Sequence, residues 1–128
     1  MLESEIRMRR NKWQDALTSG NYSQYKGLLH FLTDRTEGFC CLGVACHIFK
    51  NEDDLVIRTK HVYDEIQYYD DIRSDWRSGF LPLKLGRYLG LSQNSQNILS
   101  CLNDKGVSFH IIGSVIQYLP IEEEGYEG

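Results

Sequence analysis

The hydrophobic residues near the start of the chain recur with the spacing of an α-helix. Ile6, Trp13 and Leu17 fall on one face of a helix over residues 3–19. Gly20 follows at a position where helices commonly end in a left-handed residue. We therefore expect an amphipathic first helix with Trp13 as its anchor in the core.

The next segment has the pattern of a short hairpin followed by a buried helix. Residues 28–33 suit a strand, residues 34–38 form a polar turn, and the chain can return through Phe39. Residues 41–49 are apolar on every side and include the small residue Gly43, which is typical of a short helix packed closely on all faces. We place this helix at the middle of the core.

The middle of the chain gives weaker signals. Residues 55–59 alternate, with Leu55 and Ile57 on one side, which indicates a strand. Residues 62–80 carry aromatic and charged side chains without a clean period. We expect this second segment to be an irregular or inserted excursion.

The final third of the chain predicts three helices. The first covers residues 82–89 and begins at Pro82, a residue that suits the first turn of a helix. A serine that can cap a helix precedes each of the other two, which we expect over residues 93–102 and 109–119.

These elements together predict one α+β domain over residues 1–120, dominated by helices and holding a short β-hairpin or a small antiparallel sheet. We expect residues 121–128 to form an acidic flexible tail. The positions that we assign to one core are Trp13, Leu42, Val44, Ile48, Leu89, Ile112 and Ile116.

Length and composition agree with a single soluble domain, because the chain has 128 residues, of which 41% are hydrophobic and 25% charged. Four of the 18 acidic residues lie in the last eight positions, so the rest of the chain has as many acids as the 14 Lys and Arg. A neutral body exerts no overall attraction on nucleic acid, and the last predicted helix has no Lys or Arg to contact it. We therefore expect no DNA binding.

The sequence also bears on the compartment. No apolar run approaches the roughly 20 residues that cross a bilayer. The first residues include Glu3 and Glu5 and lack the apolar segment of a secretion signal. We expect a cytoplasmic protein without membrane contacts, located in the host cytoplasm if the chain is viral.

Four cysteines raise the question of metal or disulfide chemistry: Cys40, Cys41, Cys46 and Cys101. Their spacing differs from the paired thiolates of zinc sites, and a reducing compartment disfavours a disulfide. We expect reduced cysteines that act as small hydrophobic residues, with no metal and no other cofactor.

A catalytic thiol is a sharper alternative, and it stays open at this stage. Cys40 stands at the predicted start of the apolar helix, where the helix dipole can lower the pKa of a thiol. His30 or His61 could then act as the base, with Gln24 or Asn103 as an orienting group or oxyanion donor. This arrangement would make the protein a cysteine hydrolase.

Polar residues near the predicted turns suggest a second alternative, a binding site for a small nucleotide. Tyr22 and Gln24 could lie beside Asn103 and Asp104, giving an aromatic face for a base and polar groups for its edge or a ribose. Such a protein would act as a nucleotide sponge. The interpretation that we favour is simpler, namely that Asn103 and Asp104 cap the turn that follows them.

A Tyr-rich, acidic segment is the candidate surface for a protein partner. Tyr63, Tyr68, Tyr69 and Trp76 offer large apolar area among charged residues, as interface anchors with a polar rim do. Burial of the same rings in the core explains the sequence at least equally well.

Two motifs carry a resemblance to known proteins. FCCLGVAC covers residues 39–46, and LNDKGVSF covers residues 102–109. Over residues 10–117 the chain resembles a widespread group of small, uncharacterised bacteriophage and prophage proteins, and it departs from their pattern at His47 and His110. The resemblance implies a viral or prophage origin and no particular chemistry.

Small size, the lack of an assembled catalytic set and this resemblance together predict a non-enzymatic phage accessory protein. We expect it to act by stoichiometric binding of a host protein, such as a defence or regulatory factor that it would inhibit.

Overall fold

The helices of the domain gather on one side of a small sheet. The computed structural model describes residues 2–70 and 80–122 of the chain. Its helices are α1 Leu2–Thr18, α2 Cys41–Phe49, α3 Leu83–Tyr88, α4 Gln93–Asp104 and α5 Phe109–Ile116. Its strands are β1 His30–Leu32, β2 Glu37–Phe39, β3 Arg58–Val62 and β4 Glu65–Tyr69. The predicted α+β class with dominant helices is confirmed.

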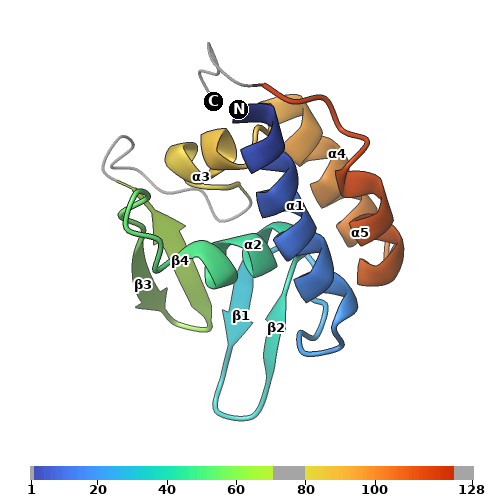
Figure 1. The fold of residues 1–128 in the computed structure, drawn as a ribbon. Coiled ribbons are helices and arrows are strands. Elements are labelled where there is room, and N and C mark those ends of the chain that lie inside the picture. Colours follow the sequence, from blue (N-terminus) through green and yellow to red (C-terminus); the bar gives the residue numbers. More distant parts are fainter. Residues whose placement is uncertain (1, 71–79, 123–128) are drawn as a thin grey trace.

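The strands form one antiparallel sheet in the order β2-β1-β4-β3. His30 pairs with Phe39 between β1 and β2, and Phe31 of β1 pairs with Glu65 of β4. Figure 1 shows α2 between this sheet and the remaining helices, and α2 contacts α1, α4 and β2. The core therefore surrounds α2.

The central helix occupies the residues that its apolar pattern predicts. A Cβ atom at Gly43 would collide with the carbonyl oxygen of Leu29, so only glycine allows α2 to approach the chain before β1 this closely. Ile48 is half-buried against the core rather than within it. The other six positions that we assign to the core are all buried in one cluster: Trp13, Leu42, Val44, Leu89, Ile112 and Ile116.

A buried arginine on the apolar face of α1 ties the helices together. Arg10 of α1 is completely buried, and its guanidinium group donates five hydrogen bonds of 2.7–3.1 Å to backbone carbonyls near the ends of α3 and α5. Burial lowers the pKa of Arg10 to about 10, so the group is still charged at neutral pH. The acceptors are the carbonyl oxygens of Leu89, Gly90, Ile116, Leu119 and Pro120.

Left-handed glycines and serine caps lie at several helix ends where the sequence predicts them. Gly20 and Gly90 have left-handed φ angles of 82° and 62° after α1 and α3. The Ser92 and Ser108 hydroxyls accept hydrogen bonds from backbone N–H groups in the first turns of α4 and α5. Two helix ends differ from the prediction: α4 continues to Asp104, two residues before the left-handed Gly106, and α5 already ends at Ile116.

Two expectations for the middle of the chain are wrong. A strand was expected over residues 55–59, but Leu55 N donates to Glu52 O in a turn and Val56 has a φ of 49°, so β3 begins only at Arg58. The expected irregular excursion contains the regular strand β4. In β4, the polar residue Gln67 is as deeply buried as the next residue, Tyr68. The strand therefore lacks the alternation of buried and exposed residues that marks a strand with one solvent-facing side.

The two described residues beyond position 120 still contact the helical part of the chain. Glu122 N donates to Gly90 O at 2.9 Å, so residues 121 and 122 lie against the end of α3. The remaining expected tail, residues 123–128, lies outside the described residues. Among the residues that the structure describes, no helix is long and apolar enough to span a membrane.

Candidate functional site

The residues considered for nucleotide binding come together, but their polar groups bond within the chain. Gln24 Nε2 donates to Asn103 Oδ1 at 3.0 Å and to Val107 O at 2.7 Å. Asn103 is completely buried; its Nδ2 donates to Tyr25 O, and its Oδ1 also accepts from Cys41 N. This bonding holds the segment before β1 against α4 and the start of α2, a structural role broader than the expected cap.

The other two residues of this group are also engaged. Asp104 Oδ1 accepts a hydrogen bond from Gly27 N at 3.0 Å. The half-buried ring of Tyr22 packs edge-on against Phe39 and His47, with ring centroids 5.3 Å and 5.8 Å away. These contacts support a structural role for the group rather than a nucleotide site.

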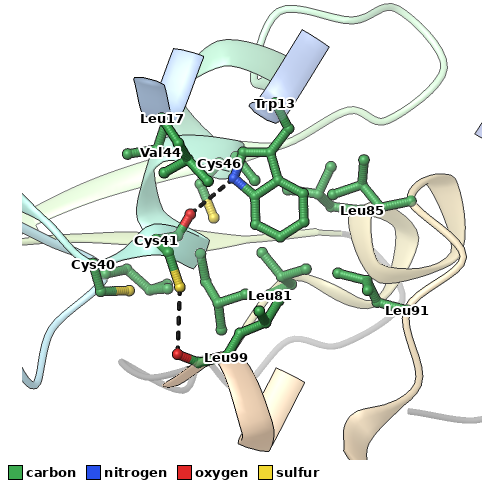
Figure 2. Close-up of a cluster of buried hydrophobic side chains, with 14 of the residues drawn as sticks. Trp13, Leu17, Cys40, Cys41, Val44, Cys46, Leu81, Leu85, Leu91 and Leu99 are labelled. Carbon is green, nitrogen blue, oxygen red and sulfur yellow. Dashed lines mark hydrogen bonds between the residues drawn. The ribbon is translucent and has the colours of Figure 1, made fainter. Parts of the chain in front are cut away.

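The cysteines of α2 form part of the packed core. Figure 2 shows Cys40, Cys41 and Cys46 among buried hydrophobic side chains, with Trp13 Nε1 donating to Cys41 O at 2.9 Å and Cys41 Sγ donating to Leu99 O at 3.6 Å. Burial raises the pKa of all three thiols, and that of Cys40 reaches about 11. Cys101 of α4 is exposed.

Cys40 stands at the N-cap of α2, as predicted, but its environment does not activate it. Its Sγ accepts a hydrogen bond from Gly43 N at 3.4 Å, which favours the thiolate, whereas desolvation has the larger and opposite effect on its pKa. The residue is only 5% exposed. A protonated, covered sulfur is a poor nucleophile, so this geometry does not support the hydrolase hypothesis.

His30, the first candidate base, belongs to a buried hydrogen-bonded array that the sequence did not reveal. Its Nδ1 lies 2.8 Å from the hydroxyl of Tyr68, and its Nε2 lies 2.7 Å from Glu37 Oε2. Its ring also stacks on Phe39, with centroids 4.0 Å apart. Both ring nitrogens are thus engaged with partners other than a cysteine.

Burial is the main cause that lowers the pKa of His30, with the contact to Glu37 acting in the opposite direction. A neutral ring carries one proton, and the ionised carboxylate of Glu37 can only accept. The hydrogen bonds therefore assign the proton to Nε2, which donates to Glu37, while the Tyr68 hydroxyl donates to Nδ1. The array orders three strands, since its members come from β1, β2 and β4.

Next to this array, two hairpin turns enclose a surface pocket of about 370 Å³. Leu32 N donates to Asp64 O at 2.8 Å, which joins the end of β1 to the turn between β3 and β4. His61, the second candidate base, lies here on an exposed part of β3. The lining residues of this turn pocket are Leu32, Thr33, Asp34, His61, Tyr63 and Asp64.

The expected partner-binding residues separate into different environments. Tyr63 is 94% exposed at the turn between β3 and β4, and Tyr69 is half-buried. Tyr68 is only 2% exposed, so the expectation that it is an exposed anchor is wrong, because its hydroxyl is committed to His30. Trp76 lies outside the described residues.

No set of three or more His, Cys, Asp or Glu side chains within residues 2–70 and 80–122 is arranged to hold a metal ion. The fold and the sites described above define a small α+β domain with a thiol-rich core and an exposed aromatic turn beside a pocket. The chain belongs to the family described as a domain of unknown function, DUF8296, which matches residues 3–119. No curated protein and no solved structure matches the chain.

Proposed function

We propose that this protein is a phage-encoded accessory protein that acts by stoichiometric binding of a host protein, a defence or regulatory factor. The phage origin rests on the two sequence motifs, FCCLGVAC and LNDKGVSF. Binding rather than catalysis is supported by the state of the candidate catalytic groups. The Cys40 thiol is covered and its pKa is raised, and both nitrogens of His30 are engaged.

The observation that carries the proposal is the conformation of Tyr63. This residue has a φ of 55°, a left-handed conformation that costs a residue other than glycine about 1–2 kcal/mol. Its ring is 94% exposed, so burial within the folded chain does not offset that cost. A large aromatic side chain held outward on a strained turn is suited to serve as an anchor for a partner.

The surroundings of Tyr63 also suit a contact surface. The turn is held to β1 through the hydrogen bond from Leu32 N to Asp64 O, so the anchor is presented on a sheet rather than on a long loop. The adjoining turn pocket provides a concave surface into which a partner can insert a side chain.

The experiment compares two tyrosines of similar exposure. The tagged full-length protein, Tyr63→Ala and Tyr118→Ala are each used to capture proteins from a bacterial host lysate, with quantitative mass spectrometry as the readout. Tyr118 is 87% exposed beyond the end of α5 and provides the matched control. We expect one host protein to be retained near equimolar amounts by the wild type and by Tyr118→Ala, and to be lost with Tyr63→Ala.

Thermal unfolding of both variants shows that loss of capture does not reflect loss of the fold. The purified partner is then titrated against each variant, and Tyr63→Ala is expected to weaken binding by about 1–3 kcal/mol. Capture of every host protein to the same extent by the wild type and Tyr63→Ala would overturn the proposal.

A further inference from the structure

We infer that the turn pocket receives an arginine side chain of the bound host protein. The inference rests on the proposed function and names the chemical group that the partner presents. Its basis is the set of residues that line the pocket, which includes two aspartates and a tyrosine together with Leu32, Thr33 and His61.

The pocket is unbalanced in charge. Asp34 comes from the β1–β2 turn and Asp64 from the β3–β4 turn, and no Lys or Arg is among the lining residues. Within residues 2–70 and 80–122, neither carboxylate forms an ion pair or accepts a hydrogen bond. Arg35, the nearest cationic residue in the sequence to Asp34, does not line the pocket. A cation that enters from outside would therefore meet two aspartates with no Lys or Arg among the lining residues, where His61 is the one basic side chain.

A third carboxylate extends the negative face. Glu37 lies opposite Leu32 in the β1–β2 register, next to the pocket, and half of its side chain is exposed. Its Oε2 is bonded to His30, whose pKa is lowered by burial, so at neutral pH the imidazole leaves the negative charge of Glu37 in place. The acidic groups thus come from three positions on two hairpins and not from one run of sequence.

Two other lining residues, Tyr63 and Leu32, favour a guanidinium group over other cations. A planar guanidinium group stacks well on an aromatic face and can donate to two carboxylates at once, whereas an ammonium group is compact and strongly hydrated. Tyr63 provides the aromatic face, and Leu32 provides apolar contact for the methylene groups of the side chain. A bound metal ion is less suited, because two carboxylates supply too few of the oxygen ligands that Ca²⁺ or Mg²⁺ requires.

The pocket is large enough to admit a side chain of a partner. At about 370 Å³ it lies at the lower end of the range for small-molecule pockets, about 300–1,000 Å³. Its position beside the exposed Tyr63 ring places it within the contact surface that we propose, where a pocket that accepts an arginine is a common centre of binding energy.

The test uses arginine itself, separate from any host protein. The ¹⁵N-labelled full-length chain is titrated with N-acetyl-arginine methylamide, and the same titration is run with the citrulline and lysine analogues. We expect arginine to shift the amide signals of residues 32–34 and 61–64, citrulline to leave them unchanged, and lysine to bind more weakly. Citrulline has nearly the shape of arginine without its charge, so it isolates the electrostatic contribution.

Variants test which residues hold the arginine. Asp34→Asn combined with Asp64→Asn should weaken arginine binding about tenfold or more, since it removes both charge-assisted hydrogen bonds. Asp53→Asn removes one exposed acid elsewhere and should leave binding unchanged. Equal shifts with citrulline, binding of lysine as tight as that of arginine, or unchanged binding in the double variant would each overturn the inference.

The outcome is separable from that of the proposed function. If host-protein capture depends on Tyr63 but the pocket fails these tests, the arginine assignment alone is wrong. If no captured protein depends on Tyr63, the proposed function fails whatever the arginine titration shows. The double variant should also lose at least tenfold in affinity for the captured host protein if its arginine occupies the pocket.

Discussion

The helices and the sheet of this domain satisfy their polar groups to different degrees. In the helical part, comprising α1 to α5, Arg10 is completely buried, and its guanidinium group donates five hydrogen bonds to backbone carbonyls. In the sheet part, comprising β1 to β4 and their turns, the buried acceptors Glu65 Oε2 and Gln67 Oε1 have no hydrogen-bond partner among the described residues. An unsatisfied buried acceptor costs about 1–3 kcal/mol.

Backbone strain follows the same division. Both non-glycine residues with a positive φ in the described chain, Val56 and Tyr63, lie in the turns around β3. Strand β3 itself is exposed along most of its length. The comparison indicates that the helical part acts as the scaffold, whereas the sheet part retains the costs that commonly accompany a binding site.

The largest expected effect tests whether the scaffold depends on Arg10. Arg10→Met keeps much of the side-chain volume but removes five hydrogen bonds, of which four are buried and the one to Pro120 O is partly buried. We expect the free energy of unfolding to fall by about 3–5 kcal/mol, measured by urea denaturation. Arg7→Met is the matched control, because the bond from Arg7 to Gln117 O is exposed and its loss should cost less than about 1 kcal/mol.

A loss of under about 1 kcal/mol in Arg10→Met would mean that the helices are held by apolar packing alone. Arg10→Lys adds a further step. It keeps the charge but offers at most three donors on one atom, so its stability should fall between those of the wild type and Arg10→Met.

The next effect tests the array that orders the sheet. Tyr68→Phe removes the hydroxyl that donates to His30 Nδ1 and leaves a buried nitrogen without its donor. We expect the free energy of unfolding to fall by about 1–3 kcal/mol. Relative to the wild type, hydrogen exchange should accelerate more in β1 and β4 than in α1. Tyr118→Phe, at an exposed position, should change neither quantity. Equal acceleration of exchange in α1 would show that the two parts unfold as one unit.

A smaller effect concerns pH. The pKa of His30 is lowered from its ordinary value of 6.5, first by burial, so the unfolded chain takes up a proton more readily than the folded one. The stability that the neutral ring contributes is therefore fully present above pH 6.5 and is lost as the pH falls below that value. Protonation at Nδ1 would also displace the hydrogen bond from Tyr68.

Urea denaturation between about pH 7.5 and pH 5 should show stability falling with acid, and the fall should be smaller in His30→Phe. His47 acts in the same direction, since burial and then Lys50 lower its pKa. The variant His47→Phe measures separately how much His47 contributes to the pH dependence of stability. An unchanged pH dependence in His30→Phe would contradict the assignment to His30.

The division between the two parts also explains how much the sequence could predict. The helical part follows from local signals: the apolar stripe with Trp13, the caps at Ser92 and Ser108, and the stops at Gly20 and Gly90. Arg10 lies on the same helix face as Ile6, Trp13 and Leu17, which is a local signal of burial, but its acceptors are far away in the chain and cannot be assigned from the sequence. Its function in the fold is visible only after the helices pack.

Much less of the sheet could be predicted. Strand β3 is almost wholly exposed and β4 buries polar residues, so neither shows the alternation by which strands are recognised. Because β4 was not expected, the meeting of Tyr68 with His30 and Glu37 could not be foreseen. Tyr63 is exposed, as a contact residue must be, but its left-handed conformation depends on the turn that the sequence did not predict.

The smallest effect bears most directly on function. Tyr63→Gly removes the penalty of a left-handed tyrosine, and we expect the unfolding free energy to rise by about 0.5–1 kcal/mol, reduced by the greater freedom of glycine in the unfolded chain. Tyr63→Ala keeps the strained backbone and removes the same exposed ring, so its stability should stay near that of the wild type. Both variants should lose the host protein. A gain in stability coupled to a loss of binding would show that the strain at this turn is retained for the contact. If Tyr63→Gly is instead less stable than Tyr63→Ala, the turn is not strained and the observation that carries the proposed function is removed.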